Sequence, residues 1–310
     1  MARIRFWIAV LFPAFAGFAT VLVSVHYLRE YGGTLFLGLP FAMGFASAII
    51  AGRAEKHTFS RMLGAAQLSL VVLGFCLLGL WVEGIICLVM AFPLASGIGL
   101  IGTACGRGII HLFPDSRSRQ LIPLILFCFL PFLLNFEASQ HSVPTLHKVV
   151  STIEIDAPIE KVWKTVVAFP QIEKEPEGIL RLGFAYPINA RIDGSGVGAI
   201  RYCNFNTGPF VEPITEWQEP NVLAFDVKEQ PQPMTETSPW GDIHTGHMEY
   251  IRSQKGQFRL YEKDGKTVVE GTTFYTHDIA PDIYWKWYSD EIIHQVHMRV
   301  LNHIKEVSEL

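Results

Sequence analysis

Hydrophobic residues dominate the first 136 positions of the chain and fall there into five long runs. The runs extend over Ile4 to Tyr27, Leu35 to Gly52, Leu63 to Trp81, Gly84 to Ala104 and Leu121 to Phe136. A helix needs roughly 20 apolar residues to cross the hydrocarbon core of a bilayer, with about 17 as the usual lower end. The pattern therefore predicts an all-α transmembrane region of about five helices over residues 1–136. The last run has marginal length and decides between four helices and five.

Two features of this region leave alternatives open. Only Val82 and Glu83 separate the third and fourth runs, so these two runs form either two crossings or one re-entrant hairpin. The first run has a basic start and contains small residues, which also fits a signal peptide, although its apolar stretch is long for one. Arg5, next to the start of the first run, is the only Asp, Lys or Arg within the runs as bounded above, and the interior of each run has none. Because ion paths usually need such groups, the region is interpreted as an anchor or scaffold.

The basic residues alternate between the segments that connect the runs. Eight of them lie at or before the start of the first run, or follow the second and the fourth, namely Arg3, Arg5, Arg53, Lys56, Arg61, Arg107, Arg117 and Arg119. The other connections contain one, Arg29. Positively charged loops stay in the cytoplasm. We therefore expect an integral multi-pass membrane protein with a cytoplasmic N-terminus, and five crossings place everything after the last run on the extracytoplasmic side.

The pattern changes after a polar linker at residues 137–147. Val149 to Asp156 is rich in β-forming residues, and the break at Ala157-Pro158 precedes a short helix over Glu160 to Phe169. A second short helix is predicted over Gln171 to Glu175. The proline-rich stretch Gln230 to Gly241 has no apolar period and is predicted to be a loop.

Short β-rich segments separated by turn signals follow from Arg191 onward. They cover Ala199 to Asn206, Phe210 to Trp217, Val222 to Glu229, Gly256 to Glu262 and Thr267 to Thr276. Their spacing is typical of successive antiparallel hairpins.

A helix is predicted from Pro281 to the end of the chain. Its apolar positions fall within one stripe, formed by Trp285, Ile292, Ile293, Val296, Val300, Ile304 and Val307. That stripe must cover a sheet. Residues 148–310 therefore predict an α+β domain in which a long C-terminal helix lies across a curved antiparallel sheet.

The opening VVSTIEIDAPIEKVWKTV, followed by this order of elements, resembles the SRPBCC or START-like helix-grip superfamily over residues 148–308. That superfamily contains START lipid-transfer domains, polyketide cyclases and dehydrases, and the birch-pollen-allergen group. Its members hold apolar ligands between the long helix and the sheet. The resemblance therefore implies a helix-grip fold with a hydrophobic cavity at that place, whereas the fused membrane region is not part of the general pattern.

Charge and cysteine content argue against several other classes of protein. Nine Lys and Arg stand against four Asp and Glu up to Phe136, and sixteen against twenty-five after it. An acidic second half argues against nucleic acid, because phosphate binding needs clustered basic residues. Cys203 is the one cysteine after Phe136, so no disulfide framework forms there. No cofactor fingerprint occurs, and no cofactor is expected.

The candidate ligand contacts lie on the last helix and on one strand. Trp285 and Tyr288 combine an apolar body with a polar group, which suits the mouth of a pocket. Ile292 and Val296 belong to the stripe that faces the sheet, and Arg201 is a candidate polar contact. For Trp285 and Tyr288, core packing or anchoring against lipid uses the same residues.

Acid-base and metal chemistry have weaker candidates. Glu212, Glu270 and His294 are considered as catalytic groups, because a carboxylate or imidazole beside an apolar cavity can act as a general acid or base. Strand alternation leaves open whether either carboxylate faces inward. His294 and His297 are one helical turn apart and form a possible metal pair. His297 projects near the edge of the stripe and His294 well away from it, which favours surface or capping histidines, so no metal is expected.

The sequence therefore favours a membrane-anchored domain that binds or transfers a lipid or another hydrophobic small molecule, without enzymatic activity. One alternative is a cyclase or dehydratase-type enzyme that uses a buried carboxylate or histidine in the same cavity. Another is a protein-binding subunit of a membrane assembly, whose cavity is filled by its own side chains.

Overall fold

The computed structural model describes residues 2–52, 59–112, 121–140, 143–238, 241–243 and 251–310. The chain divides into two compact units. The first comprises Met1–Val143 with Glu236–Gly246 and Ile279–Pro281, and the second comprises Pro144–Thr235, His247–Asp278 and Asp282–Leu310. Four of the residues on which the predicted orientation depends, Arg53, Lys56, Arg117 and Arg119, lie outside the described residues.

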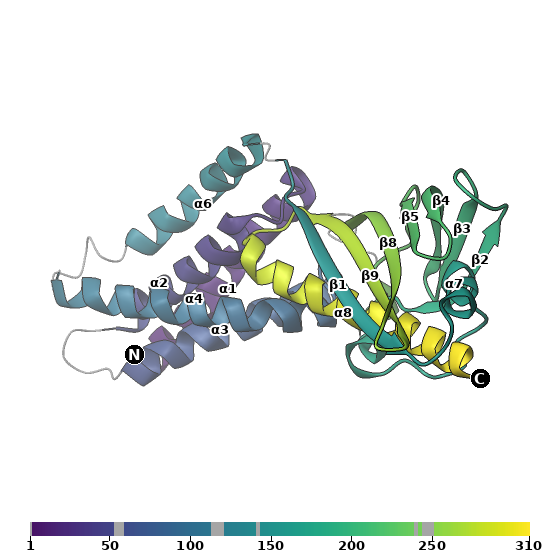
Figure 1. Cartoon of the computed structure of the whole chain (residues 1–310). Helices are drawn as coiled ribbons and strands as arrows, with labels where there is room; N and C mark the ends of the chain where they lie inside the picture. Colours follow the sequence, from purple (N-terminus) through teal and green to yellow (C-terminus); the bar gives the residue numbers. More distant parts are fainter. Residues whose placement is uncertain (1, 53–58, 113–120, 141–142, 239–240, 244–250) are drawn as a thin grey trace. The chain divides into compact units, whose positions relative to one another are not determined.

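Five long apolar helices build the described part of the first unit (Figure 1). They are α1 (Ala2–Leu22) with a π-helical extension η1 (Val23–Leu28), α2 (Leu39–Ala51) preceded by η2 (Thr34–Gly38), α3 (Phe59–Gly79), α4 (Ile85–Leu112) and α6 (Ile122–Ser139). Each helical stretch is long and apolar enough to cross a membrane. Each of the five predicted runs overlaps one of them, although α4 continues to Leu112, beyond the predicted end at Ala104. The third and fourth runs form separate helices of 21 and 28 residues.

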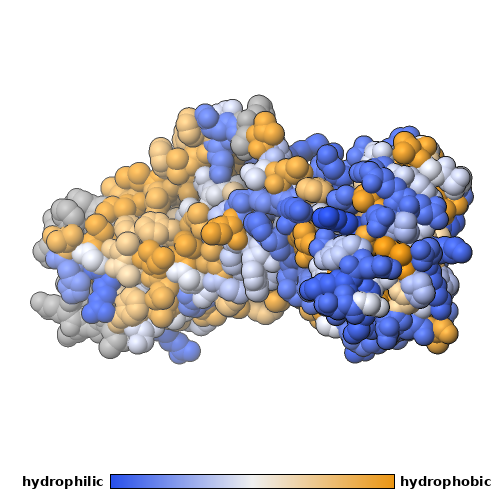
Figure 2. Space-filling model, viewed as in Figure 1, coloured by the Kyte–Doolittle hydropathy of each residue, from blue (hydrophilic) through white to orange (hydrophobic). Residues whose placement is uncertain are grey.

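The outer surface of these helices is hydrophobic. Figure 2 shows hydrophobic residues over most of their visible face. Large apolar side chains such as Phe15, Phe75, Phe92 and Phe132 are exposed there. A contiguous exposed apolar surface of this kind marks contact with a membrane or a protein partner.

Helices α2 and α4 pack through glycines at backbone distance. A Cβ atom on Gly44 would lie 2.0 Å from the Gly99 carbonyl oxygen, and one on Gly102 would lie 2.2 Å from that of Phe41. A Cβ on Gly106 would meet the Phe45 carbonyl oxygen at 2.8 Å. Small residues spaced in this way let two apolar helices approach closely.

A short hairpin from the second half of the chain belongs to the first unit. Its strands are β6 (Glu236–Ser238) and β7 (Gly241–Ile243). Part of the stretch predicted to be a loop, Gln230 to Gly241, is therefore β-structure. The fully buried Glu236 carboxylate accepts hydrogen bonds from the backbone N–H groups of Ile86 (3.1 Å) and Cys87 (2.7 Å). It thereby satisfies N–H groups that the first turn of α4 leaves without a helical partner.

The second unit contains a seven-stranded antiparallel sheet in the order β1-β9-β8-β5-β4-β3-β2. The strands are β1 (Leu146–Ile155), β2 (Pro187–Asp193), β3 (Ile200–Phe205), β4 (Gly208–Gln218), β5 (Val222–Asp226), β8 (Ile251–Lys263) and β9 (Lys266–His277). Register shifts at Pro187/Asn189, Ile214/Glu216 and Ser253/Lys255 interrupt the pairing of β2, β4 and β8. Such bulges bend a strand and increase its twist, which curls the sheet.

The long helix α8 (Asp282–Glu309) lies across the curled sheet, as the yellow helix of Figure 1 shows. Val300, Leu301 and Ile304 of α8 join a core with Val162, Trp163 and Val166 of α7 (Ile159–Val167) and with inward residues of the strands. The predicted α+β class, a curved antiparallel sheet gripped by a C-terminal helix after an apolar helical region, is confirmed.

Two local predictions differ from the structure. Gln171 to Glu175 is not helical, because the chain there runs beside β2, where the Ile172 N–H donates to the Ile188 carbonyl (2.8 Å). A short 3-10 helix, η3 (Gly178–Leu182), follows instead. Strand β2 begins four residues before Arg191, and β8 begins five residues before the predicted Gly256.

Candidate ligand-binding cavity

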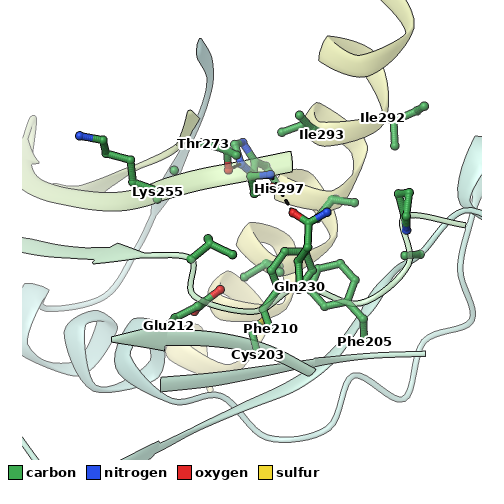
Figure 3. Close-up of a pocket in the computed structure, with 18 of the residues that line it drawn as sticks. Cys203, Phe205, Phe210, Glu212, Gln230, Lys255, Thr273, Ile292, Ile293 and His297 are labelled. Atoms are coloured by element: carbon green, nitrogen blue, oxygen red, sulfur yellow. Dashed lines mark hydrogen bonds between the residues drawn. The ribbon is translucent and has the colours of Figure 1, made fainter. Parts of the chain in front are cut away.

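A cavity of about 170 Å³ lies between α8 and the sheet of the second unit (Figure 3). Its aromatic lining consists of Phe184, Phe205, Phe210, Phe225 and Phe258. The lining from α8 includes Ile292, Ile293, Val296, Val300 and Leu301. The wall is therefore mainly apolar, as expected of a site for hydrophobic molecules.

The sheet makes room for one of these rings by a glycine. Gly256 of β8 lies opposite Phe225 of β5 in the strand register. A Cβ atom on Gly256 would lie only 2.5 Å from Cζ of Phe225. The absence of a side chain at Gly256 thus lets the Phe225 ring lie over the strand.

A buried ion pair interrupts the apolar wall. Arg201 of β3 and Glu212 of β4 are register partners, and one guanidinium nitrogen, Nη1, donates to Oε2 of Glu212. Both residues are buried, at 2% and 5% exposure, and both line the cavity. Arg201 Nε also donates to the Val167 carbonyl oxygen (3.1 Å). Because each charge has a partner, the pair is stable in an apolar wall where either ion alone would be costly.

Aromatic rings surround the guanidinium of Arg201. Its Cζ atom lies 5.5 Å from the ring centre of Phe225, 5.6 Å from that of Phe258 and 5.8 Å from that of Phe169. Such contacts favour a desolvated cation. Burial raises the pKa of Glu212, and the adjacent Arg201 charge opposes that rise.

Cys203 lies two residues after Arg201 and also lines the cavity. Burial, and then the Glu212 charge, raise the pKa of this thiol to about 12. The thiolate is the nucleophilic form of cysteine. Cys203 therefore contributes an inert apolar surface rather than a nucleophile.

A chain of hydrogen bonds joins α8 to the sheet at His297. Its Nε2 atom lies 2.7 Å from the Thr273 hydroxyl oxygen and its Nδ1 atom 3.0 Å from the Ser151 hydroxyl oxygen. The same Ser151 hydroxyl lies 2.7 Å from Nδ1 of His294. Burial, and then the proximity of His294, lower the pKa of His297 to about 4. His297 is thus a neutral imidazole near pH 7, and it faces the cavity together with Thr273 (Figure 3).

The sequence-predicted site residues separate into two groups. Arg201, Ile292 and Val296, predicted as ligand contacts, line the cavity, and so do Glu212 and His297. The remaining candidates, Trp285, Tyr288, Glu270 and His294, are not among its lining residues.

These remaining candidates have other neighbours. Trp285 is buried and packs edge-to-face against Tyr284, with ring centres 5.3 Å apart. The ring of Tyr288 lies 6.2 Å from that of Trp285. Glu270 accepts a hydrogen bond from the Tyr261 hydroxyl (3.2 Å). The two histidines of the possible metal pair meet at a serine hydroxyl, which accounts for their proximity without an ion.

Sequence reasoning did not single out Ser151 or Thr273. Ser151 lies on the edge strand β1 and Thr273 on its neighbour β9. Their contact with α8 depends on the packing of the helix against the sheet. Alternation along GTTFY in β9 places Thr273 on the same face as the buried Tyr275. That alternation is a signal that identifies Thr273 as inward-facing.

Comparisons with known proteins give structural likeness only. No family model matches the chain, and no curated protein matches it. Among solved structures, a protein from Nitrosospira multiformis matches with 20% identity and a TM-score of 0.35, covering 52% of this chain and 96% of that one. Truncated norcoclaurine synthase from Thalictrum flavum matches with 13% identity and a TM-score of 0.35, covering 54% and 96%.

A further match is the di-domain ARO/CYC protein BexL of the BE-7585A biosynthetic pathway, with 12% identity and a TM-score of 0.34. It covers 69% of this chain and 63% of that one. At such scores these matches carry no functional argument. The helix-grip architecture rests on the strand order and the closing helix of this chain.

Proposed function

We propose that this protein binds, and passes on, a small hydrophobic molecule in the cavity between α8 and the sheet, with residues 1–136 as a membrane anchor. Residues 137–147 serve as the linker and residues 148–310 as the binding domain. The observation that carries the proposal is an apolar cavity with one internally neutralised ion pair in its wall. Burial of apolar ligand surface at about 25 cal/mol per Å² supplies most of the affinity.

The size of the cavity narrows the ligand class. An engineered protein cavity of about 150 Å³ holds benzene. A cavity of about 170 Å³ therefore suits a single ring or a short acyl segment. A complete two-chain lipid needs a further opening of α8 from the sheet, or leaves most of its length outside.

The polar groups of the wall set the orientation of such a ligand. Arg201 and Glu212 neutralise one another, so this part of the wall favours a neutral group such as a hydroxyl or a ketone over a second full charge. The Thr273 hydroxyl, which is also bonded to His297, offers a further hydrogen-bonding atom. The ligand that fits best is a small amphipathic molecule with an apolar body and an uncharged polar group.

Ligand uptake by the full chain in lipid nanodiscs tests this proposal. A single-ring probe, fluorobenzene followed by fluorine NMR, is titrated into the wild type and into two variants with the same substitution on α8. Ile293→Phe fills the cavity, whereas Ile283→Phe changes a residue that is 82% exposed. We expect saturable binding that is at least tenfold weaker in Ile293→Phe and unchanged in Ile283→Phe. Equal binding by all three proteins, or none by the wild type, contradicts the proposal and favours a protein-binding subunit.

An acid-base enzyme is the second candidate, favoured by the neutral His297 in the cavity wall. A neutral imidazole beside a bound ketone can accept a proton. The test is turnover of hydroxyketone or polyketone probes, followed by mass spectrometry. Loss of product in His297→Asn with retained probe binding supports an enzyme. Absence of any turnover in the wild type supports a carrier.

We also propose a cytoplasmic N-terminus and an extracytoplasmic binding domain, which five crossings imply. The fifth helix, α6, has 18 residues, within the range that crosses a bilayer. A reporter that fluoresces only in the cytoplasm, fused after Leu310, is expected to stay dark. Fluorescence from that fusion together with fluorescence from an N-terminal fusion indicates an even number of crossings.

A further inference from the structure

Two histidines and an aspartate that have no role in the cavity converge at one place in the second unit. His147 lies in β1, His277 ends β9 and Asp282 begins α8. One ligand atom from each lies within 4.8 Å of the others. Nε2 of His147 is 2.8 Å from Oδ1 of Asp282, and Nε2 of His277 is 3.5 Å from the same oxygen.

We propose that His147, His277 and Asp282 form a binding site for a divalent transition-metal ion, with Zn²⁺ as the ion that suits them best. Two imidazole nitrogens and one carboxylate oxygen are the ligand set of many sites for Zn²⁺ and its neighbours in the first transition row. Mg²⁺ and Ca²⁺ prefer oxygen ligands throughout. The chemistry of the three ligands therefore selects a borderline metal ion.

The geometry of the three ligand atoms fits this assignment. Zn–N and Zn–O bonds of about 2.0 to 2.1 Å place neighbouring ligand atoms of a tetrahedral site roughly 3.3 Å apart. The two measured nitrogen–oxygen separations, 2.8 and 3.5 Å, bracket that value. Small side-chain rotations that shift these ligand atoms by about a few tenths of an ångström bring them to the separations that a metal requires.

The surroundings hold the two imidazoles in place. His147 and His277 are buried, at 6% and 4% exposure, and their rings stack with centres 5.0 Å apart and an interplanar angle of 21°. The buried ring of Tyr275 packs beside both, at 5.3 and 6.1 Å. The Asp282 side chain is 53% exposed, which gives an ion a route from solvent and leaves a fourth position for water or another ligand.

Hydrogen bonding alone is the competing explanation for this cluster, because Asp282 Oδ1 is also within hydrogen-bond distance of Nε2 of His147. The substitution Asp282→Asn separates the two explanations. An asparagine keeps an oxygen acceptor for the histidines but removes the negative charge that a divalent ion requires. Because Asp282 is exposed, this change leaves folding intact.

The experiment uses the full chain, purified in detergent without a histidine tag and titrated with Co²⁺ and Zn²⁺. We expect one ion per chain, visible absorption bands of tetrahedral or five-coordinate Co²⁺ that Zn²⁺ abolishes, and no response to Mg²⁺.

Variants decide which residues carry the binding. We expect His147→Ala and Asp282→Asn to weaken Co²⁺ binding at least tenfold. His303→Ala, a change in a histidine whose Nε2 donates to the Pro170 carbonyl instead, leaves binding as in the wild type. A melting temperature of Asp282→Asn without metal that equals that of the wild type shows that folding is retained. Absence of saturable Co²⁺ binding in the wild type, or unchanged binding in the first two variants, overturns the proposal.

Discussion

The carboxylates of Glu236 in the helical unit and Glu212 in the sheet unit are stabilised by different means. In the helical unit, Glu236 and the partly buried Glu137 accept hydrogen bonds from backbone N–H groups at helix starts. In the sheet unit, Glu212 is paired with an arginine side chain. A helix leaves its first N–H groups unpaired and carries a partial positive charge there, whereas the backbone groups of a central strand are used by its neighbours. A sheet therefore needs a second charged side chain where a helix bundle does not.

This difference makes the ion pair in the cavity wall more sensitive to single substitutions than a carboxylate at a helix start. An ion pair in an apolar wall requires both partners at once, because either one alone is an uncompensated charge. A carboxylate at a helix start requires only one charged residue. We therefore expect single substitutions to be most damaging at the pair and progressively less so elsewhere.

The largest effect is expected for Glu212→Ala. The substitution leaves Arg201 charged and buried, which costs about 3–5 kcal/mol of the free energy of unfolding. Urea unfolding followed by tryptophan fluorescence measures this, since Trp163 and Trp217 pack against each other in the core (ring centres 5.5 Å apart). The double variant Arg201→Met/Glu212→Leu restores most of the lost stability. A loss below about 1 kcal/mol in Glu212→Ala would show that the pair is solvated rather than buried.

Loss of the carboxylate at α4 is expected to cost about 2 kcal/mol, because Glu236→Ala leaves two buried N–H groups without their acceptor. Gly84→Ala provides a matched test. A Cβ there would lie 2.1 Å from Oε2 of Glu236 and 2.9 Å from its Cβ, so it displaces the same carboxylate.

The losses of stability caused by Glu236→Ala and Gly84→Ala must then be non-additive, because both remove the same carboxylate from its site. Thermal melting in detergent gives both single values, and the double variant is expected to lose no more than the larger single loss. Glu262→Ala, at an exposed site of β8, serves as control with little effect. Additive losses would mean that Glu236 and Gly84 stabilise the unit independently.

The neutral His297 predicts a loss of stability in acid. Its pKa in the folded protein is about 4, below the ordinary value of 6.5. As pH falls from about 6.5 to 4, the unfolded chain therefore binds a proton that the folded chain does not, and stability decreases through this window. We expect the wild type to lose about 1–2 kcal/mol more than His297→Gln over this range, measured by urea unfolding at several pH values. Parallel pH profiles would place His297 in contact with solvent.

The overall fold can be predicted from the sequence because its main signals are local patterns. The stripe from Trp285 to Val307 identified α8, and turn residues such as Asp264-Gly265 separated the strands. Strand β2 began earlier than predicted, because PINA gives no alternation that distinguishes it from a loop. The residues Gln171 to Glu175 have polar helix formers, but a backbone hydrogen bond to Ile188 fixes them beside a strand.

The site was predictable only where register was fixed locally. Phe205 pairs with Gly208 across a two-residue turn, and that register places Arg201 opposite Glu212. A shift of one residue in the predicted turn sends every side chain of β4 to the other face, so the sequence alone does not determine the direction of Glu212. His277 and Asp282 are close in sequence, at the end of β9 and the start of α8, but His147 belongs to β1, which is remote from both. Their meeting depends on how β1, β9 and α8 pack, which no local pattern contains.

Substitution of Glu270 is expected to change stability least. It tests the same comparison with a carboxylate that is only partly buried. This carboxylate lies on β9 beside cavity-lining residues, yet its partner is the tyrosine hydroxyl of Tyr261 rather than an arginine or a helix start. It needs no strong counter-charge because it is only partly buried and solvent stabilises the ion. Glu270→Gln is therefore expected to change the free energy of unfolding by less than about 0.5 kcal/mol and to leave probe binding in nanodiscs unchanged. A tenfold loss of probe binding would instead assign Glu270 to the ligand site. Glu270 would then face the cavity as Glu212 does, and its partial exposure would not explain why it has no charged partner.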